Sequence, residues 1–226
     1  MKPATPSAWL AAPILPVVVV EDADAALFIA GAFLEAGLNQ IEITLRSAGS
    51  LAALAAVVRR FPAMKVAAGT VLDPAQVARV KDAGATLCVS PGFTPALAEA
   101  MQAGSMPWVP GVATASEVMR ACEAGCNLLK FFPAMAAGGP PALQAIAGAL
   151  RPARDGNLNF IPTGGVSLAN LGTWKATGCV VAVGGTWLAK DSVVASRAQV
   201  AVVAATREAL AAWHGTPLEA SSAAAG

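Results

Sequence analysis

A lysine interrupts an apolar run in the second half of the chain. The run reads Leu128-Leu129-Lys130-Phe131-Phe132, and Lys130 is its only charged residue. Because strand side chains alternate between two faces, Lys130 shares a face with Leu128 and Phe132. An ammonium group without a partner is costly to bury, and burial favours the neutral amine. A neutral lysine amine is the nucleophile that forms a Schiff base with a carbonyl compound, so Lys130 is a candidate catalytic residue.

An earlier apolar run carries a carboxylate. In Gln40-Ile41-Glu42-Ile43-Thr44-Leu45-Arg46, the alternation places Glu42, Thr44 and Arg46 on one face and the three apolar residues on the other. If the apolar face packs against helices, the polar face points into the interior. Glu42 is then a candidate general acid and base. Alternatively, Glu42 and Arg46 form a structural ion pair, although buried ion pairs stabilise a fold only weakly.

Paired glycines follow two later apolar runs, in Thr163-Gly164-Gly165-Val166-Ser167 and in Gly184-Gly185-Thr186. Each pair lets backbone N–H groups approach a ligand closely, with a helix N-terminus expected behind it. In (β/α)₈ barrels the loops after strands seven and eight commonly bind phosphate. Each pair alone also fits a simple turn. With Lys130 and Glu42, the two pairs predict an enzyme that acts on a phosphorylated sugar through an imine.

The sequence has few of the residues that several other kinds of catalysis require. The chain has one histidine, His214, and no tyrosine, which argues against histidine-based metal sites, Ser-His-Asp or Cys-His nucleophiles and tyrosine acids. We therefore expect no metal and no cofactor. Two cysteines lie four residues apart on a predicted helix and allow a zinc site as an alternative, but small core residues fit better than zinc or disulfides. The cysteines are Cys88, Cys122, Cys126 and Cys179.

Composition limits the remaining classes of protein. Of 226 residues, 56% are hydrophobic and 13% are charged, with a formal net charge of +1. This balance argues against disorder and against a nucleic-acid partner. The most apolar stretch, Ala11–Val20, contains two prolines and leads into Glu21 and Asp22, which fits a buried strand better than a membrane span or a signal peptide. We expect a cytoplasmic protein that does not bind membranes.

Eight apolar runs alternate with helical patterns along the chain. Helix starts are marked by Asp73-Pro74, Thr94-Pro95 and the capping box from Thr114 to Glu117, and helix ends by Gly84, Gly104 and Gly125. The last helix is expected from about Asp191 to Trp213. The predicted strands are Ile14–Val20, Gln40–Leu45, Lys65–Val71, Thr86–Ser90, Met106–Val109, Leu128–Phe132, Asn159–Pro162 and Cys179–Val183.

Strict alternation of strand and helix predicts a parallel α/β fold. Eight units in this length predict a single (β/α)₈ TIM barrel domain over residues 1–226. An open, doubly wound sheet is the alternative, but no GxGxxG follows the first strand. Residues 1–13 are expected to form a short N-terminal helix across the barrel floor, and residues 221–226 a disordered tail.

The motifs together resemble the bacterial 2-keto-3-deoxy-6-phosphogluconate (KDPG) aldolases, which are also 4-hydroxy-2-oxoglutarate (KHG) aldolases. The resemblance extends in order from about Ile14 to Lys190. It implies a class I, metal-independent lyase that releases pyruvate and glyceraldehyde 3-phosphate, and a homotrimer. The strings that carry it are Ile41-Glu42-Ile43-Thr44-Leu45-Arg46, Ala68-Gly69-Thr70-Val71, Ser90-Pro91-Gly92, Val109-Pro110-Gly111, Leu129-Lys130-Phe131-Phe132-Pro133-Ala134, Pro162-Thr163-Gly164-Gly165 and Gly184-Gly185-Thr186-Trp187.

The resemblance also implies roles for individual residues. Lys130 would form the Schiff base and Glu42 would be the general acid and base. Other residues would bind substrate: Arg46 and Thr70 the pyruvyl carboxylate, Pro91 through its backbone, Phe132 beside the imine, Thr163 a hydroxyl, and Gly164, Gly165, Gly185 and Thr186 the phosphate. Many relatives have Ser where Thr186 stands, so the phosphate pocket is expected to be tighter here.

Three rival functions fit parts of the same pattern. The first is the galactonate-series phosphate aldolase of the same family, or oxaloacetate decarboxylation through the same imine. The second is a metal-dependent aldolase, which the single histidine disfavours. The third is a non-catalytic phosphosugar-binding barrel, which has no need for Lys130 and Glu42 to share the interior.

Overall fold

The strands of the computed structural model, which describes residues 6–215, lie in two parallel sheets. The larger sheet has the order β5-β4-β3-β2-β1-β9 and the smaller has the order β6-β7-β8. The sequence therefore predicts the parallel α/β class correctly. The strands are β1 Ile14–Val18, β2 Gln40–Thr44, β3 Lys65–Gly69, β4 Leu87–Val89, β5 Trp108–Val109, β6 Gly111–Val112, β7 Leu128–Phe131, β8 Asn159–Pro162 and β9 Val183–Gly185.

Short junctions connect the two sheets. In place of the predicted fifth strand, 106–109, the structure has β5 and a further short strand, β6, which was not predicted. The two are separated by Pro110, which has no N–H to donate to a ladder. Its carbonyl still accepts a hydrogen bond from the Lys130 N–H at 2.8 Å. At the other junction, isolated parallel bridges join Phe160 to Val180 and Thr163 to Gly184. The predicted eighth strand, 179–183, is displaced, since the ladder to β1 begins only at Val183.

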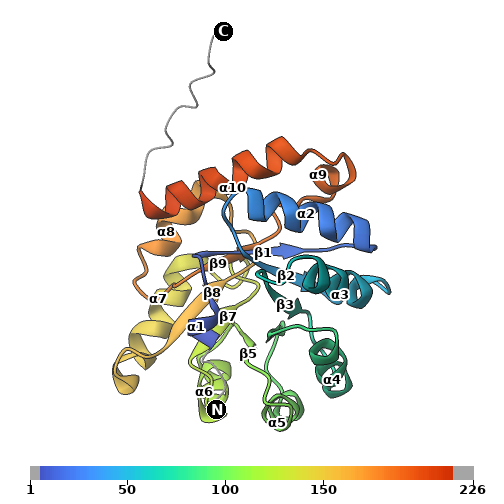
Figure 1. The fold of residues 1–226 in the computed structure, drawn as a ribbon. Helices are drawn as coiled ribbons and strands as arrows, with labels where there is room; N and C mark the ends of the chain where they lie inside the picture. Colours follow the sequence, from blue (N-terminus) through green and yellow to red (C-terminus); the bar gives the residue numbers. More distant parts are fainter. Residues whose placement is uncertain (1–5, 216–226) are drawn as a thin grey trace.

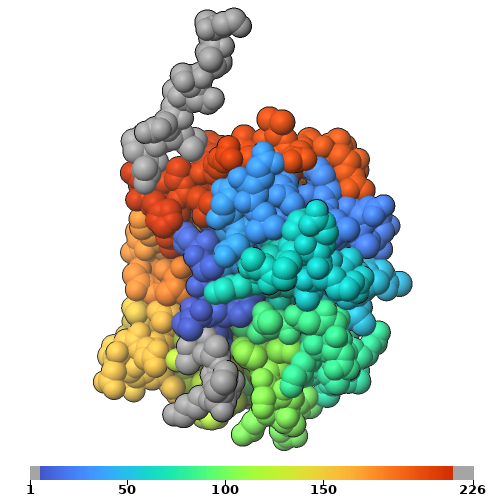
Figure 2. Space-filling model, in the orientation of Figure 1, coloured from blue at the N-terminus to red at the C-terminus, as the bar shows by residue number. Residues whose placement is uncertain are grey.

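Helices surround the strands, and successive parts of the chain occupy successive sectors around the molecule (Figures 1 and 2). The predicted last helix is broken at 196–198, where Arg197 has a positive φ of 52°. The helices are α1 Pro6–Trp9, α2 Ala23–Glu35, α3 Ser50–Arg60, α4 Pro74–Asp82, α5 Pro95–Ala103, α6 Ala115–Glu123, α7 Gly139–Leu150, α8 Leu171–Lys175, α9 Asp191–Ala195 and α10 Gln199–His214, with 3₁₀ turns at Pro152–Arg154 and Leu168–Asn170.

Local capping explains where several helices begin. Asp73 and Thr94 cap α4 and α5 as predicted, and Thr114 forms the predicted capping box with Glu117. The Glu117 carboxylate accepts hydrogen bonds from the N–H groups of Ala113 and Thr114, and these bonds lower its pKa. A carboxylate in the first turn also interacts favourably with the helix dipole.

One predicted helix end differs in detail. Gly84 and Gly125 have positive φ values of 93° and 84°, as expected for glycines that end helices. After α5, however, Gly104 remains right-handed and the next residue, Ser105, has a φ of 49°. The turn was predicted correctly, but the residue with the left-handed conformation is Ser105 and not the predicted Gly104.

Two hydrophobic clusters confirm the predicted alternation. Ile41, Ile43 and Phe131 belong to the outer cluster between strands and helices. The smaller, inner cluster includes Leu128 and is completed by Trp9 of α1. The predicted N-terminal helix therefore covers one end of the strands, where the Trp9 indole N–H donates to Thr86 Oγ1 at 2.8 Å. The expected tail, residues 221–226, lies outside the described residues.

The four cysteines are free thiols, so no disulfide pairs them. Burial raises the pKa of the Cys88 thiol to about 12 and that of Cys126 to about 11. Cys126 follows α6 rather than lying on it with Cys122, and within residues 6–215 no group of three or more His, Cys, Asp or Glu is placed to hold a metal ion. No helix in the same range is long and apolar enough to cross a membrane.

Candidate active site

The side chains of Lys130 and Glu42 contact each other between the two sheets. The Lys130 Nζ lies 3.1 Å from Glu42 Oε1, and the exposed fractions of the two side chains are 7% and 1%. β2 and β7 belong to different sheets, so the pair spans the interior rather than one ladder. It is the only ion pair among the described residues, which makes the alternative Glu42–Arg46 ion pair wrong.

A glycine makes room for the Glu42 carboxylate. Gly69 is at the end of β3, and a Cβ placed on it would lie 2.3 Å from Glu42 Oε1. Glu42 pairs with Ala67 in the β2–β3 ladder, so its side chain extends along the inner face and over Gly69. A glycine inside a strand commonly marks such a close approach.

Arg46 and Thr70 lie side by side at the carboxyl ends of β2 and β3. The Arg46 Nε donates a hydrogen bond to Thr70 Oγ1 at 3.3 Å. Thr70 has a φ of 58°, which is unusual for a β-branched residue. Such strained backbone conformations are often found at functional sites. Arg46 is exposed, so its guanidinium N–H groups remain accessible to an anion. The structure thus brings together the two residues predicted to bind a carboxylate.

Phe132 lies beside Lys130, and Thr163 follows by two positions Ile161, the β8 residue that pairs with Lys130. The Lys130 Nζ lies 5.4 Å from the centre of the Phe132 ring, within the range of a cation–π contact. Thr163 is buried, and a Cβ on Gly184 would lie 2.3 Å from its Oγ1. As at Gly69, the missing glycine side chain leaves room for a polar group.

The first predicted glycine pair forms a tight loop. Gly164 and Gly165 have positive φ values of 100° and 77°, and a Cβ on Gly165 would lie 2.7 Å from Met135 Cγ. The Asn170 side-chain amide donates to the Gly165 carbonyl at 2.9 Å and fixes the loop. The expected helix N-terminus lies behind it, since a short 3₁₀ helix over 168–170 begins after Ser167 and leads directly into α8.

The second pair is also followed by irregular chain. Gly185 ends β9, Thr186 is exposed, and α9 begins only at Asp191. A Cβ on Gly185 would lie 2.3 Å from ring atoms of Trp187, so the indole packs against the glycine backbone. Both glycine loops are at carboxyl ends of strands, as predicted, but a helix begins close behind only the first one.

Gly69, Gly111 and Gly184 have structural roles that the sequence pattern does not reveal. Each stands in or next to a predicted strand, and a Cβ on each would collide with a polar atom: Glu42 Oε1, the Pro91 carbonyl oxygen and Thr163 Oγ1, respectively. A glycine within a strand pattern is the available signal. It does not show which polar group occupies the space.

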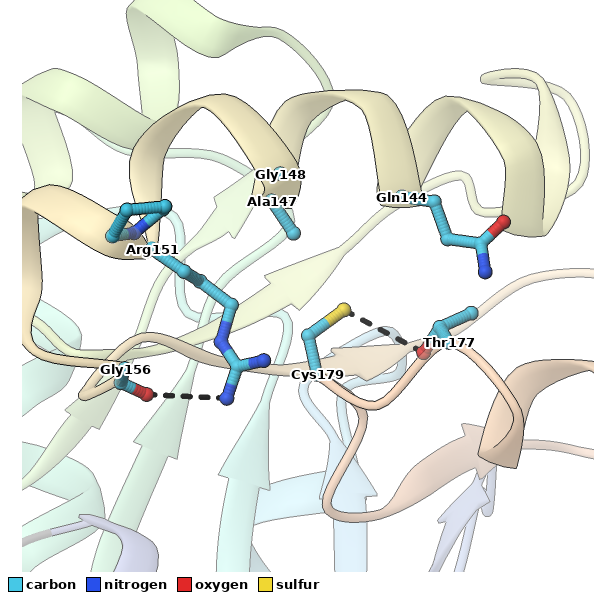
Figure 3. A pocket seen from close by; sticks show the side chains of 8 residues that line it. Gln144, Ala147, Gly148, Arg151, Gly156, Thr177 and Cys179 are labelled. Atoms are coloured by element: carbon cyan, nitrogen blue, oxygen red, sulfur yellow. Dashed lines mark hydrogen bonds between the residues drawn. The ribbon is translucent and has the colours of Figure 1, made fainter.

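A separate cavity of about 470 Å³ lies beside the amino ends of β8 and β9 (Figure 3). Arg151 donates from Nη2 to the Gly156 carbonyl at 3.2 Å and from Nη1 to the Gly178 carbonyl at 2.9 Å. Arg151 thereby holds together the segments that precede β8 and β9. None of the predicted site residues lines this cavity.

The arrangement supports a specific kind of chemistry. A lysine amine and a carboxylate 3.1 Å apart can exchange a proton, which leaves a neutral amine to attack a carbonyl carbon. The neighbouring Arg46–Thr70 pair offers donors for a carboxylate on the same molecule. A 2-oxo acid carries both groups.

Comparison with known proteins decides the family. The family model for KDPG and KHG aldolases matches residues 7–205. The chain belongs to the KDPG and KHG aldolase family. It is 39% identical to the 2-dehydro-3-deoxy-phosphogluconate aldolase of Dickeya dadantii, over 89% of this chain and 92% of that protein. It is 42% identical to the KHG/KDPG aldolase of Escherichia coli K12, over 78% and 80% of the two chains.

A solved structure of a family member has the same fold. The KDPG aldolase of Legionella pneumophila, with pyruvate captured as a covalent carbinolamine intermediate, matches with a TM-score of 0.87 and 35% identity. The match covers 92% of this chain and 98% of that one. The family predicted from the sequence motifs is therefore confirmed.

The Gly69 contact gives a first prediction. Gly69→Ala places a methyl group on the Glu42 carboxylate and forces it away from Lys130. A misplacement of about 1 Å can lower a rate by about 10²-fold, so we expect kcat for cleavage of KDPG to fall by about that factor. Steady-state kinetics measures it.

Gly172→Ala is the matched control, since a Cβ there meets no atom within 4 Å. It should leave kcat unchanged. If Gly69→Ala folds and retains wild-type kcat, the Glu42 carboxylate does not need the space that the glycine leaves.

Proposed function

We propose that the protein cleaves KDPG to pyruvate and glyceraldehyde 3-phosphate as a class I aldolase. The observation that supports this most strongly is the buried Lys130–Glu42 pair, 3.1 Å apart. A structural role accounts poorly for it, because desolvation of two charges offsets most of their attraction. The names of the relatives agree with this reaction.

The first half of the reaction forms an imine. Lys130 gives its proton to Glu42 and attacks the C2 ketone of the substrate. Glu42 returns this proton to the hydroxyl group of the resulting carbinolamine, which leaves as water and gives an iminium ion. The Glu42 carboxylate, directly or through a water molecule, then removes the proton of the C4 hydroxyl group. The C3–C4 bond breaks, glyceraldehyde 3-phosphate leaves as the aldehyde, and the electron pair enters the iminium to form an enamine.

The second half returns the enzyme to its starting state. Glu42, now protonated, delivers its proton to C3 of the enamine, which becomes the methyl group of a pyruvyl iminium. Water adds to this iminium, and pyruvate and free Lys130 are released. One carboxylate can act in both halves because its protonation alternates between them.

Neighbouring residues hold the reacting end of the substrate. Arg46 and Thr70 bind the carboxylate next to the ketone through their side-chain donors. Phe132 packs beside the imine, the Pro91 backbone lines the pocket, and Thr163 forms a hydrogen bond with a substrate hydroxyl.

The phosphate binds at the glycine loops. Gly164, Gly165, Gly185 and Thr186 follow or end neighbouring strands, β8 and β9. Their backbone N–H groups and the Thr186 hydroxyl supply hydrogen bonds to the phosphate oxygens. This proposal does not need a helix N-terminus.

The same imine chemistry also fits the smaller substrate 4-hydroxy-2-oxoglutarate, which gives pyruvate and glyoxylate. This is the activity that the name of the Escherichia coli relative includes. The galactonate-series phosphate differs from KDPG in stereochemistry at the cleaved bond, and assays of both epimers distinguish it.

We further propose that the strands close into an eight-stranded (β/α)₈ barrel, with β5 and β6 forming one interrupted strand. The bridges from Phe160 to Val180 and from Thr163 to Gly184 support closure between β8 and β9, and the Lys130–Glu42 contact between the two sheets requires that they face each other. Resemblance to the family supports two more proposals, a homotrimer and a cytoplasmic location. Light scattering in solution tests the first.

The imine gives a second prediction. Treatment with pyruvate and borohydride should inactivate the protein and add a reduced pyruvyl group to the peptide that contains Lys130. Lys130→Arg should abolish both labelling and cleavage, because a guanidinium keeps the positive charge beside Glu42 but cannot act as the nucleophile. Peptide mass spectrometry and kinetics measure the two effects.

The control is Lys81→Arg, at an exposed lysine that donates to the Gly104 carbonyl. This variant should still be labelled at Lys130 as in the unaltered protein. Labelling at a lysine other than Lys130 would contradict the mechanism, and loss of wild-type cleavage in EDTA would favour the metal-dependent rival.

The phosphate loops give a third prediction. A hydrogen bond to a charged group contributes about 1.5–3 kcal/mol, and about 1.4 kcal/mol is tenfold. Two such bonds should therefore give KDPG an advantage in kcat/KM over 4-hydroxy-2-oxoglutarate of at least about 10²-fold. Thr186→Val keeps the side-chain volume, removes the hydroxyl and should reduce this advantage by about tenfold.

The unphosphorylated substrate is the internal control, since it does not reach this loop. Thr186→Val should leave its kcat/KM within about twofold. Equal damage to both substrates, or equal wild-type efficiency on both, would mean that the glycine loops do not bind the phosphate.

A further inference from the structure

The carbonyl group of Pro91 lies next to Gly111, the residue that pairs with Lys130. Gly111 pairs with Lys130 in the ladder between β6 and β7, and paired residues of parallel strands direct their side chains to the same face. A Cβ placed on Gly111 would lie 2.0 Å from the Pro91 carbonyl oxygen. This oxygen therefore occupies the inward space next to Lys130 that a side chain at position 111 would fill.

The residues around Pro91 are held by a chain of hydrogen bonds. The Ser90 hydroxyl is fully buried; it donates to the Gly92 carbonyl at 2.7 Å and accepts a bond from the Trp108 indole N–H at 2.9 Å. The Trp108 ring also stacks on Phe93, with ring centres 5.5 Å apart. Trp108 is thereby connected to the segment on both sides of Pro91.

The Pro91 carbonyl oxygen itself receives no hydrogen bond from the N–H and O–H groups of residues 6–215. Backbone carbonyls are strong hydrogen-bond acceptors, and a free segment can rotate one toward a donor. The bonds made by Ser90 keep this segment from rotating. The oxygen stays available on the side where Lys130 lies.

We propose that Ser90 and Trp108 are positioning residues that hold the Pro91 carbonyl oxygen beside the Lys130 nitrogen. The proposal rests on the proposed function, because the nitrogen is neutral after Lys130 gives its proton to Glu42 and becomes positive again when the iminium ion forms. A carbonyl dipole whose negative end is already in place stabilises that developing charge without reorganisation. Loss of either positioning residue should therefore slow imine formation.

The experiment measures the rate of imine formation with saturating pyruvate, by borohydride quenching at successive times, together with kcat for KDPG. Ser90→Ala removes both hydrogen bonds and should lower both rates by about tenfold, whereas Trp108→Phe keeps the stacking on Phe93 and the bond to Gly92 and should lower them by about threefold. The ratio of kcat/KM for phosphorylated to unphosphorylated substrate should not change, because the carbonyl lies at the end of the site that both substrates share. Ser90→Thr keeps a hydroxyl group and should recover part of the loss.

Thr86→Val is the matched control. Thr86 also accepts a hydrogen bond from a tryptophan, Trp9, at 2.8 Å, but it lies just before the amino end of β4. Its variant should keep both rates within about twofold of wild type even if its thermal stability falls as much as that of Ser90→Ala.

Wild-type imine formation in Ser90→Ala, or an equal loss of rate in Thr86→Val, would overturn the positioning role. If Ser90→Ala does not fold, Trp108→Phe decides the matter, and wild-type rates in that variant would overturn it. Failure of the unaltered protein to form an imine would instead overturn the proposed function, so the two outcomes are distinguishable.

Discussion

The contact between Lys130 and Glu42 is the constraint on which the rest of the structure depends. Both side chains are almost excluded from solvent, so each charge needs the other to offset its loss of hydration. They are 88 residues apart in sequence and on strands of different sheets. The two sheets must therefore face each other with the sides that carry Glu42 and Lys130 together.

Glycines on the inner side provide the space that polar groups of the site need. Gly69, Gly111 and Gly184 each stand opposite an oxygen that a Cβ would displace. These glycines reduce the apolar contacts inside the strands, and a glycine in a strand weakens it. The larger outer cluster between strands and helices compensates, since it contains most of the buried apolar side chains. Stability and chemistry are thus supplied by opposite faces of the same strands.

Alternation within single strands predicted much of this structure. Which face holds Glu42 and Lys130 follows from the two-residue period, and capping residues located the starts of α4, α5 and α6. Alternation does not show which residues meet across the interior, so the Glu42–Arg46 ion pair remained open. The roles of Gly69, Ser90 and Gly111 depend on contacts between neighbouring strands, which a single sequence does not display. The additional strand β6 after Pro110 and the displaced start of β9 were missed for the same reason.

One variant tests whether Glu42 transfers protons while Lys130 forms the imine. Glu42→Gln keeps the shape of the side chain and a hydrogen-bonding group beside Lys130 but cannot transfer a proton. If Glu42 is the acid and base of the reaction, kcat for KDPG should fall by about 10²–10⁴-fold. Pyruvate and borohydride should still label Lys130, because a buried lysine without its carboxylate partner favours the neutral amine. A kcat close to that of the unaltered protein would contradict the account and leave the Lys130–Glu42 contact as a structural ion pair.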